Sequence, residues 1–163
     1  MKLDKLKEPY VIILVGPPLS GKTTWINKNF ESGTFELISR DQIVLDLHGD
    51  EDYNTAFKSV DQKEVDKILV NKIATSAKQK KNVIIDMTHM SSKRRKYNLS
   101  FFDDEYYKLA VIFPILKEEE YIARDKKRTE EENKSIPMNI IKNMISSYQP
   151  IKYDEGFDRV ISL

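Results

Sequence analysis

Apolar runs and amphipathic helical patterns alternate along this chain from one end to the other. Short runs rich in β-branched and aromatic residues predict strands, and apolar residues spaced three and four apart predict helices between them. The expected strands cover residues 10–15, 35–39, 82–86, 109–113 and 159–162. Regular alternation of strands with helices is typical of βαβ units, so the sequence predicts an α/β fold, a three-layer sandwich with a mostly parallel sheet.

The clearest helix is expected between the second and third strands. Its apolar residues recur on one helical face and are Val65, Ile68, Leu69, Ile73 and Ala77. Ser59 and Gln62 stand at capping-box separation just ahead of them, which predicts that this helix begins there.

A charged, helix-favouring segment, residues 117–129, follows the fourth strand and continues into a polar run, residues 130–135. We expect this segment to form a mobile helical lid. Pro137 suits the first turn of a further helix. The apolar stripe of that helix, expected to be core, consists of Ile140, Ile141, Met144 and Ile145.

The turn after the first strand fits the phosphate-binding pattern G-x-x-x-x-G-K-[ST]. Its candidate contacts to a nucleoside triphosphate are Gly16, Pro17, Pro18, Leu19, Ser20, Gly21, Lys22 and Thr23, together with the next residue, Thr24. Backbone N–H groups of such a loop point at the phosphates, while Lys22 would neutralise the β and γ oxygens and the Thr23 hydroxyl would bind Mg²⁺. The helix that opens at Thr23 adds the positive end of its dipole. An ordinary Gly-Pro turn is the alternative, but the flanking strand and helix favour a P-loop NTPase-type fold that binds ATP and Mg²⁺.

Length and composition limit the possibilities further. The 163 residues suit a single domain, residues 1–163, and the absence of cysteine excludes disulfides and thiolate metal sites. No apolar stretch approaches the ~20 residues that span a bilayer, so we expect a soluble, intracellular, cytoplasmic protein with no membrane partner. The net charge of +1 neither favours nor excludes nucleic acid, and the oligomeric state is not indicated. Two basic clusters, residues 78–81 and 93–96, are local candidates for a polyanion site, with a solvated helix face as the alternative for each.

Ligands of open parallel sheets bind beyond the carboxyl ends of the strands, so the residues that follow each strand are the candidates for chemistry. Asp41 follows the second strand and is a candidate general base for an acceptor hydroxyl, or else the N-cap of a helix over residues 42–47. Asp86 ends the third strand and is a candidate Mg²⁺ carboxylate, or a turn former. Thr88 would bind the acceptor or cap the next helix. His48 and His89 lack a metal-ligand pattern and are not expected to be catalytic.

Arg124 and Arg128 lie four apart in the expected lid helix, so they share one face and could close together over the triphosphate. The alternative is a solvated helix on which Asp125 and nearby glutamates pair with them. Aromatic residues at 97, 101, 102, 106 and 107 fit core packing better than base stacking.

Taken together, these motifs resemble the phage-type polynucleotide 5′-hydroxyl kinases over nearly the whole chain. The matching segments are residues 16–25, 38–41, 86–88, 94–95, 124–128, 136–137 and 155–160. The resemblance implies that Lys22 and Thr23 hold ATP and Mg²⁺ and that Asp41 is the general base. It also implies that Arg128, with Arg124 beside it, is the lid cation acting on the transferred phosphoryl group. The residues that it places near the acceptor are Arg40, Thr88, Arg94 and Arg95.

Two departures from that family concern the acceptor. An arginine that helps to hold the acceptor phosphate is replaced here by Val44, and the asparagine common after the motif threonine is replaced by His89. The phosphatase domain that the phage enzymes also carry has no expected counterpart. The nature of the acceptor therefore stays open at this point.

Residues 82–163 also resemble the kinase-like domain of heterogeneous nuclear ribonucleoprotein U, a nucleic-acid-binding scaffold. The leading hypothesis is an ATP- and Mg²⁺-dependent kinase that phosphorylates the 5′-hydroxyl end of DNA or RNA. One alternative is a kinase for a small-molecule hydroxyl, such as that of a nucleoside, a sugar or an antibiotic. Another is a nucleotide-gated binding module in which residues 93–96 contact phosphates. The complete phosphate loop, Asp41 and both lid arginines favour a working enzyme.

Overall fold

The computed structural model describes residue 3, residues 5–49 and residues 52–163. Within these residues a five-stranded sheet has the order β2-β3-β1-β4-β5, and all neighbouring strands pair in parallel. The strands are β1 (Tyr10–Val15), β2 (Glu36–Ser39), β3 (Val83–Asp86), β4 (Tyr107–Ile112) and β5 (Arg159–Ser162). Each predicted strand is confirmed, and the sheet is fully parallel where the sequence predicted a mostly parallel one.

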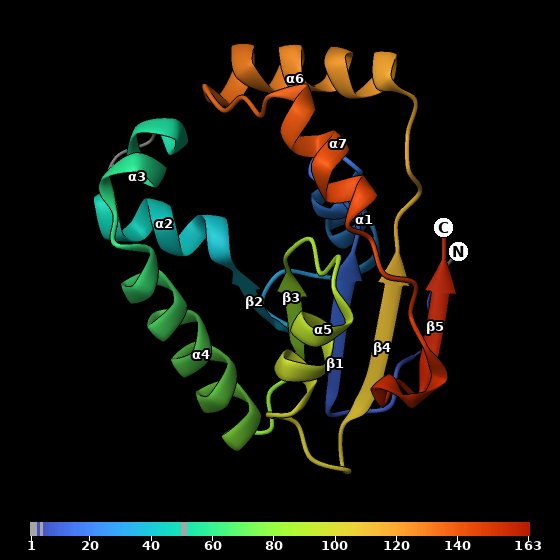
Figure 1. Cartoon of the computed structure of the whole chain (residues 1–163). Coiled ribbons are helices and arrows are strands. Elements are labelled where there is room, and N and C mark those ends of the chain that lie inside the picture. The colour runs from blue at the N-terminus through green and yellow to red at the C-terminus, as the bar shows by residue number, and fades with distance from the viewer. Residues whose placement is uncertain (1–2, 4, 50–51) are drawn as a thin grey trace.

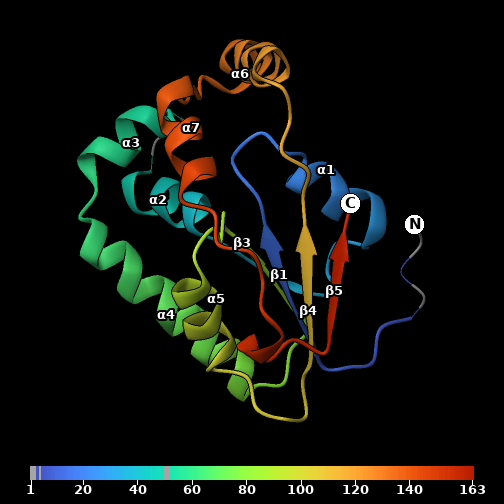
Figure 2. The same ribbon diagram turned by 45° about the vertical axis from the view of Figure 1, so that its right-hand side comes forward.

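Strand β1 lies at the centre of the sheet, and all six of its residues are buried. Side chains alternate between the two faces of a strand, so β1 supplies two cores. Val11, Ile13 and Val15 join the core beneath α2, α4 and α5, whereas Ile12 and Leu14 join the core beneath α1. Helices thus cover both faces of the sheet, which confirms the three-layer sandwich (Figures 1 and 2).

Seven α-helices and one short 3-10 helix connect the strands in the described residues. They are α1 (Lys22–Asn29), α2 (Arg40–His48), α3 (Tyr53–Ser59), α4 (Gln62–Lys78), α5 (Ser92–Leu99), α6 (Glu118–Glu132), α7 (Met138–Ser146) and η1 (Tyr153–Glu155). Described helices include none that is both long enough and apolar enough to cross a membrane.

Two expectations about helix starts are wrong. Helix α4 is capped by Asp61, whose carboxylate accepts a hydrogen bond from the backbone N–H of Lys63, and Ser59 instead donates to the carbonyl of Thr55. Pro137 is the N-cap of α7 and not part of its first turn. In both cases the helix begins within a few residues of the predicted place, because the apolar stripe fixes its position and the cap adapts to the loop.

Helix α6 corresponds to the predicted lid helix and lies across the carboxyl ends of the strands, with α7 descending from its end (Figure 1). A linker, residues 133–137, joins the two helices. Because all the strands run in parallel, the loops after β1, β2 and β3 open toward the same space beneath α6.

Candidate active site

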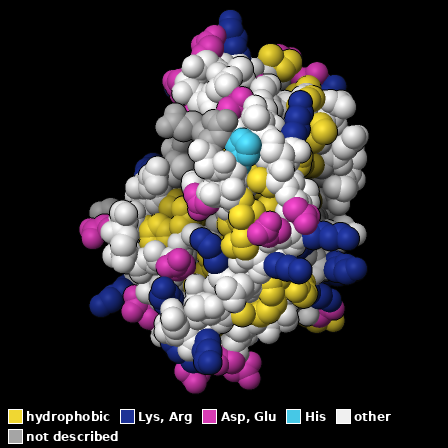
Figure 3. Space-filling view, turned by 90° about the vertical axis from the view of Figure 1, so that its left-hand side faces the viewer, with side chains coloured by type: hydrophobic (Ala, Val, Ile, Leu, Met, Phe, Trp, Pro, Cys, Tyr) yellow, Lys and Arg dark blue, Asp and Glu magenta, His cyan; other side chains and the backbone are white. Residues whose placement is uncertain are grey.

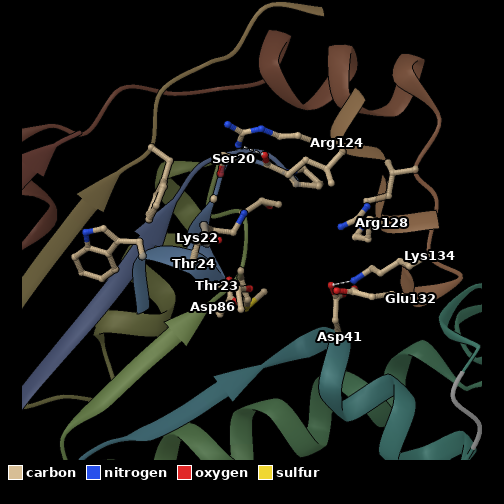
Figure 4. Close-up of a pocket in the computed structure, with 18 of the residues that line it drawn as sticks. Ser20, Lys22, Thr23, Thr24, Asp41, Asp86, Arg124, Arg128, Glu132 and Lys134 are labelled. Atoms are coloured by element: carbon tan, nitrogen blue, oxygen red, sulfur yellow. Dashed lines mark hydrogen bonds and ion pairs between the residues drawn. The ribbon is translucent and has the colours of Figure 1, made fainter. Parts of the chain in front are cut away.

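A cavity of about 950 Å³ lies between the carboxyl ends of the strands and α6. The phosphate loop and the start of α1 form one wall, and the start of α2 with Tyr53 of α3 forms the opposite wall. The loop after β3 supplies the floor, and α6 with its linker closes the top (Figure 4). The predicted residues that line it are Pro18, Leu19, Ser20, Gly21, Lys22, Thr23, Thr24, Arg40, Asp41, Asp86, Thr88, Arg124 and Arg128.

The phosphate loop is shaped by its two glycines. A Cβ at Gly16 would lie 2.9 Å from Cβ of Phe113 and 3.1 Å from Oγ of Ser20, so this position has no room for a side chain. Gly21 has φ of 95°, the left-handed conformation that favours glycine, and is the N-cap of α1. The loop is also tied to the segment after β3, since the N–H of Gly16 donates to the carbonyl of Thr88 at 2.9 Å.

The Lys22 ammonium group reaches back over the phosphate loop. Its Nζ donates to the carbonyls of Gly16 at 3.1 Å and Pro17 at 2.8 Å. Loss of hydration lowers the pKa of Lys22 to about 8, and the negative charges of Asp86 and Asp41 oppose that shift. The lysine is therefore already held at the loop, in a site where a further negative charge would stabilise its protonated form.

Thr23 and Asp86 lie close to Lys22 below the loop (Figure 4). Burial raises the pKa of Asp86, and the charge of Lys22 acts against this shift. No group of three or more potential side-chain metal ligands occurs in the described residues. The oxygens of Thr23 and Asp86 suit Mg²⁺, which binds to one or two protein oxygens and completes its coordination shell with phosphate oxygens and water.

Asp41 is in the first turn of α2, on the opposite side of the cavity. The N-cap of α2 is Ser39, so the alternative assignment of Asp41 as the cap is wrong. Its Oδ1 accepts a hydrogen bond from the Tyr53 hydroxyl at 2.8 Å, and its Oδ2 accepts one from Nζ of Lys134 at 2.6 Å. Loss of hydration alone would raise the pKa of Asp41, but the charge and hydrogen bond of Lys134 and the hydrogen bond of Tyr53 lower it overall.

The two lid arginines differ in their contacts. Nη1 of Arg124 donates to the carbonyl of Leu19 at 2.8 Å and thereby joins α6 to the phosphate loop. Arg128 is only 16% exposed, and its Nε and Nη2 have no hydrogen-bond partner among the described residues. Its nearest carboxylate oxygen is Oδ1 of Asp125, at 3.6 Å from Nη2. Buried donors without partners are unfavourable, and an anion beside them in the cavity would remove that cost.

The residues expected at the acceptor divide into two groups. Thr88 and Arg40 line the cavity, and Arg40 is held by Gln62 at 2.7 Å and by Asp66 at 3.3 Å. Arg94 is exposed on α5 and is absent from the described cavity lining.

The assignment of Arg95 to the acceptor is wrong. This side chain is completely buried and binds the Glu155 carboxylate through Nε at 2.7 Å and Nη2 at 2.8 Å. It also donates to the carbonyls of His89 and Gln149. Arg95 therefore joins α5 to the segment around η1 and is unavailable to a substrate.

The two positions that depart from the phage enzymes are also buried. Val44 is part of the core between α2 and the sheet, and its side chain is absent from the described cavity lining. His89 lies between the carbonyl of Leu14, 2.8 Å from its Nδ1, and Nδ2 of Asn98, 2.9 Å from its Nε2. Burial lowers the pKa of His89 to about 4, so the ring is neutral near pH 7 and structural in role.

The sequence did not indicate the roles of three residues of this site: Tyr53, Asp125 and Lys134. For Asp125 it indicates only a pairing with the lid arginines. Tyr53 and Lys134 both bond to Asp41, and Asp125 holds the linker that carries Lys134. No local pattern marks them, because Lys134 is 93 residues from Asp41 in the chain.

The parallel sheet and the loop around Lys22 define a phosphate-loop domain of the kinase-like type. A model of the AAA domain family matches residues 11–151, and the chain belongs to that family.

Three solved structures share the fold. A chain of the Pnkp1/Rnl/Hen1 RNA repair complex has 23% identity and a TM-score of 0.70, and the match covers 95% of this chain and 51% of that one. This protein thus spans about half the length of that relative. A candidate kinase from Chloroflexus aurantiacus j-10-fl has 14% identity and a TM-score of 0.65, with 98% and 86% covered. A gluconokinase from Sinorhizobium meliloti 1021 has 9% identity and a TM-score of 0.59, with 97% and 83% covered. At these identities the likeness concerns the fold alone.

Proposed function

We propose that this protein is an ATP- and Mg²⁺-dependent kinase that transfers the γ-phosphate to a hydroxyl group. The observation that carries the proposal is the opposition, across one cavity, of Asp41 and the phosphate loop, with the unpartnered donors of Arg128 lining the same cavity from α6. Phosphoryl transfer requires such an arrangement: a base at the acceptor oxygen, cations at the phosphates and an enclosed space. Asp41 would take the proton of the acceptor hydroxyl as that oxygen attacks the γ-phosphorus, and the bond to the β-phosphate oxygen would break to release ADP.

Each side chain has one task in this scheme. Lys22 would exchange its loop carbonyls for phosphate oxygens, and Arg128 would bind the transferred phosphoryl group. Thr23 and Asp86 would hold Mg²⁺, directly or through water, and the bound ion would neutralise charge on the β- and γ-phosphates. Arg124 would keep α6 against the loop.

The leading acceptor is the 5′-hydroxyl end of DNA or RNA. It is supported by the resemblance of the motifs to polynucleotide 5′-hydroxyl kinases and by the likeness in fold to a chain of an RNA repair complex. Within the cavity, Arg40 and Thr88 flank Asp41 and would face the acceptor end.

A small-molecule hydroxyl is the second candidate acceptor, and the positions of the basic residues in the structure favour it. Arg95 and position 44 are buried, and Arg94 lies outside the described cavity lining. On the face seen in Figure 3, Lys and Arg side chains alternate with Asp and Glu, and the described residues there show no continuous basic track. A gluconokinase also shares the fold.

The experiment is transfer of labelled γ-phosphate from ATP, with Mg²⁺, to 5′-hydroxyl DNA and RNA oligonucleotides and to a panel of nucleosides, sugars and aminoglycosides. Asp41→Asn should abolish transfer while ATP binding persists. Asp46→Asn is the matched control, because Asp46 lies on the same helix, is absent from the described cavity lining and accepts a hydrogen bond from the nearby Gln42 at 2.8 Å. Full turnover by Asp41→Asn would show that the base is misassigned. ATP binding with no transfer to any acceptor would favour a binding module.

Salt dependence separates the two acceptor classes. For a single-stranded oligonucleotide bound through Z phosphates, a plot of the logarithm of the association constant against the logarithm of the salt concentration has a slope of about −0.7Z. The association constant of a neutral metabolite should not change with salt concentration. A flat response with an oligonucleotide acceptor would count against the polynucleotide reading.

A further inference from the structure

The linker after α6 brings one side chain to the proposed base. Lys134 is only 14% exposed, and its Nζ lies 2.6 Å from Oδ2 of Asp41 and 4.0 Å from the centre of the Tyr53 ring. The ring and the carboxylate together bind the ammonium group, through a cation–π contact and a charge-assisted hydrogen bond. Figure 4 shows Lys134, from the linker, meeting Asp41, from the start of α2, on the side of the cavity that faces the phosphate loop.

The place of Lys134 is set by the lid helix and not by a free loop. Helix α6 ends at Glu132, and its C-cap residue, Asn133, has φ of 52°. Asp125, one of the α6 residues, then holds the linker: its Oδ2 accepts from the Ser135 hydroxyl at 2.8 Å and its Oδ1 from the N–H of Ile136 at 2.9 Å. Lys134 lies directly before these two anchored residues.

The same Asp125 carboxylate also faces Arg128, at 3.6 Å from its Nη2. One side chain on α6 therefore touches both the cation proposed for the transferred phosphoryl group and the linker that carries Lys134. A change in the position of α6 would move Arg128 and Lys134 together.

Polar contacts from the middle of α6 and from the linker after it reach the body of the protein. Arg124 binds the phosphate loop through the carbonyl of Leu19, and Lys134 binds α2 through Asp41. The first contact lies on the nucleotide side of the cavity and the second on the acceptor side.

We infer that Lys134 is a positioning residue for the base Asp41, and that Asp125 couples it to Arg128, so that the base is correctly oriented only when the lid lies over the phosphates. This inference rests on the proposed function. Each carboxylate oxygen can accept more than one hydrogen bond, so Asp41 can receive the acceptor hydroxyl while Tyr53 and Lys134 stay bound. During transfer Asp41 takes the proton of that hydroxyl, and Lys134 keeps its own protons throughout.

The kinetic test compares Lys134→Met with Lys126→Met. Both lysines belong to the lid region, but Lys126 is exposed and is absent from the described cavity lining. A general base contributes about 10²–10⁴-fold to a rate, and loss of its orientation removes part of that factor. We expect Lys134→Met to lower kcat about 10- to 100-fold with KM for ATP within about twofold, and Lys126→Met to match the wild type. Unchanged kcat in Lys134→Met would overturn the inference.

Two further variants separate positioning from a general structural defect. In Lys134→Ala, added methylammonium should restore part of kcat by taking the place of the lost ammonium group, and it should not restore Asp41→Asn. Asp125→Ala should lower kcat as Lys134→Met does, and the double variant should lose no more than the worse single variant, since both changes break one linkage. Additive losses, or no rescue by the amine, would contradict the proposed coupling.

A distance measurement keeps the inference testable if no acceptor is ever phosphorylated. The chain has no cysteine, so spin labels can be attached at Glu130→Cys on α6 and Lys72→Cys on α4 without further changes. In Lys134→Met the distance between the labels should lengthen or its distribution broaden, and in Lys126→Met it should not. An unaltered distance in Lys134→Met would show that this contact does not hold the lid, whatever reaction the site performs.

Discussion

Replacing Arg95 by alanine should destabilise the whole protein, although the resemblance to polynucleotide kinases implies that Arg94 and Arg95 lie near the acceptor. The side chain is fully buried, and its guanidinium group makes two hydrogen bonds to Glu155 and others to the carbonyls of His89, Gln149 and Pro150. Burial alone would raise the pKa of Glu155, but the hydrogen bond and charge of Arg95 lower it overall. The variant would leave a buried carboxylate without its partner.

The magnitude follows from this geometry. Removing one member of a buried, hydrogen-bonded ion pair costs about 3–5 kcal/mol, because the remaining charge and the freed carbonyls lose their partners in a site closed to water. For a domain of this size, each kcal/mol lowers Tm by roughly 2–4 °C, so Tm should fall by roughly 6–20 °C. Arg94→Ala is the matched control, since its neighbouring, exposed side chain should change stability by no more than about 0.5 kcal/mol.

Urea unfolding followed by tryptophan fluorescence measures this difference. The single tryptophan, Trp25, is partly buried, packs against Phe30 and Phe113 beside the core, and reports loss of tertiary structure. Replacing the pair together, as Arg95→Met with Glu155→Leu, should recover part of the stability, because no unpaired charge remains. A loss below about 1 kcal/mol in Arg95→Ala, together with a selective loss of acceptor affinity, would refute the structural role and restore Arg95 to the binding site.

Three further predictions concern the site. The folded-state pKa of His89 lies near 4 and its unfolded-state pKa near 6.5, so the free energy of unfolding should fall as the pH drops through this interval. The slope should reach about 1.4 kcal/mol per pH unit. Urea titrations between about pH 7 and pH 5 should show this slope, and His89→Gln should lack it. Lys22 has a pKa near 8, so it is about half protonated at pH 8 and should take up about half a proton when the phosphates of ATP bind beside it. Calorimetry in buffers of different ionisation enthalpy should detect this uptake, and Lys22→Arg should show none. Gly16→Ala should cost about 1–3 kcal/mol and weaken ATP binding, because the added Cβ meets Phe113 at 2.9 Å; unfolding and binding titrations test this. Gly33→Ala meets no atom within 4 Å, and although its φ of 88° makes alanine unfavourable there, ATP affinity should be unchanged in a binding titration.

The features that sequence predicted well depend on short-range patterns. A buried parallel strand needs a nearly continuous apolar run, and residues 10–15, all of them buried, match β1 at both ends. Residues 159–162 also match β5 at both ends, although Ile161 alone is buried in that edge strand. Strand β4 begins two residues before the prediction because the N–H of Tyr107 bonds to the carbonyl of Pro9, which the apolar run does not reveal. The phosphate loop could be predicted for the same local reason, since its backbone conformation demands glycine at fixed spacing.

The features that sequence could not predict depend on distant partners. Arg94 and Arg95 are chemically identical neighbours, but successive residues of a helix point about 100° apart, and α5 turns one to solvent and the other to Glu155, 60 residues away. Lys134 could have been assigned to solvent on composition alone, and only the path of the chain after α6 brings it to Asp41. A local pattern tells which residues are basic, whereas the fold decides what their charges meet.

The unpartnered polar atoms suggest a final prediction about the cost of this site. Among the described residues, the buried side-chain atoms without hydrogen bonds are Ser20 Oγ, Asn98 Oδ1 and Arg128 Nε and Nη2. All but the Asn98 atom belong to residues that line the proposed nucleotide cavity. Functional sites commonly contain such groups, which are unfavourable for stability but needed for binding or catalysis. Each buried donor without a partner costs about 1–3 kcal/mol, and an entering phosphate would remove that penalty.

Arg128→Met should therefore leave the nucleotide-free protein as stable as the wild type or up to about 1–3 kcal/mol more stable, while turnover falls. Saturating ATP stabilises any protein that binds it only when folded, by about 2.7 kcal/mol at a hundredfold excess over Kd, and this gain should shrink in Arg128→Met at equal ATP concentration. Arg124→Met is the matched control, because Arg124 already has a partner at Leu19 and its loss should not raise stability. Thermal unfolding with and without ATP measures all three proteins. A nucleotide-free Arg128→Met protein that is less stable by more than about 1 kcal/mol would mean that Arg128 serves mainly as a structural partner of Asp125, and the phosphoryl group would then need another cation.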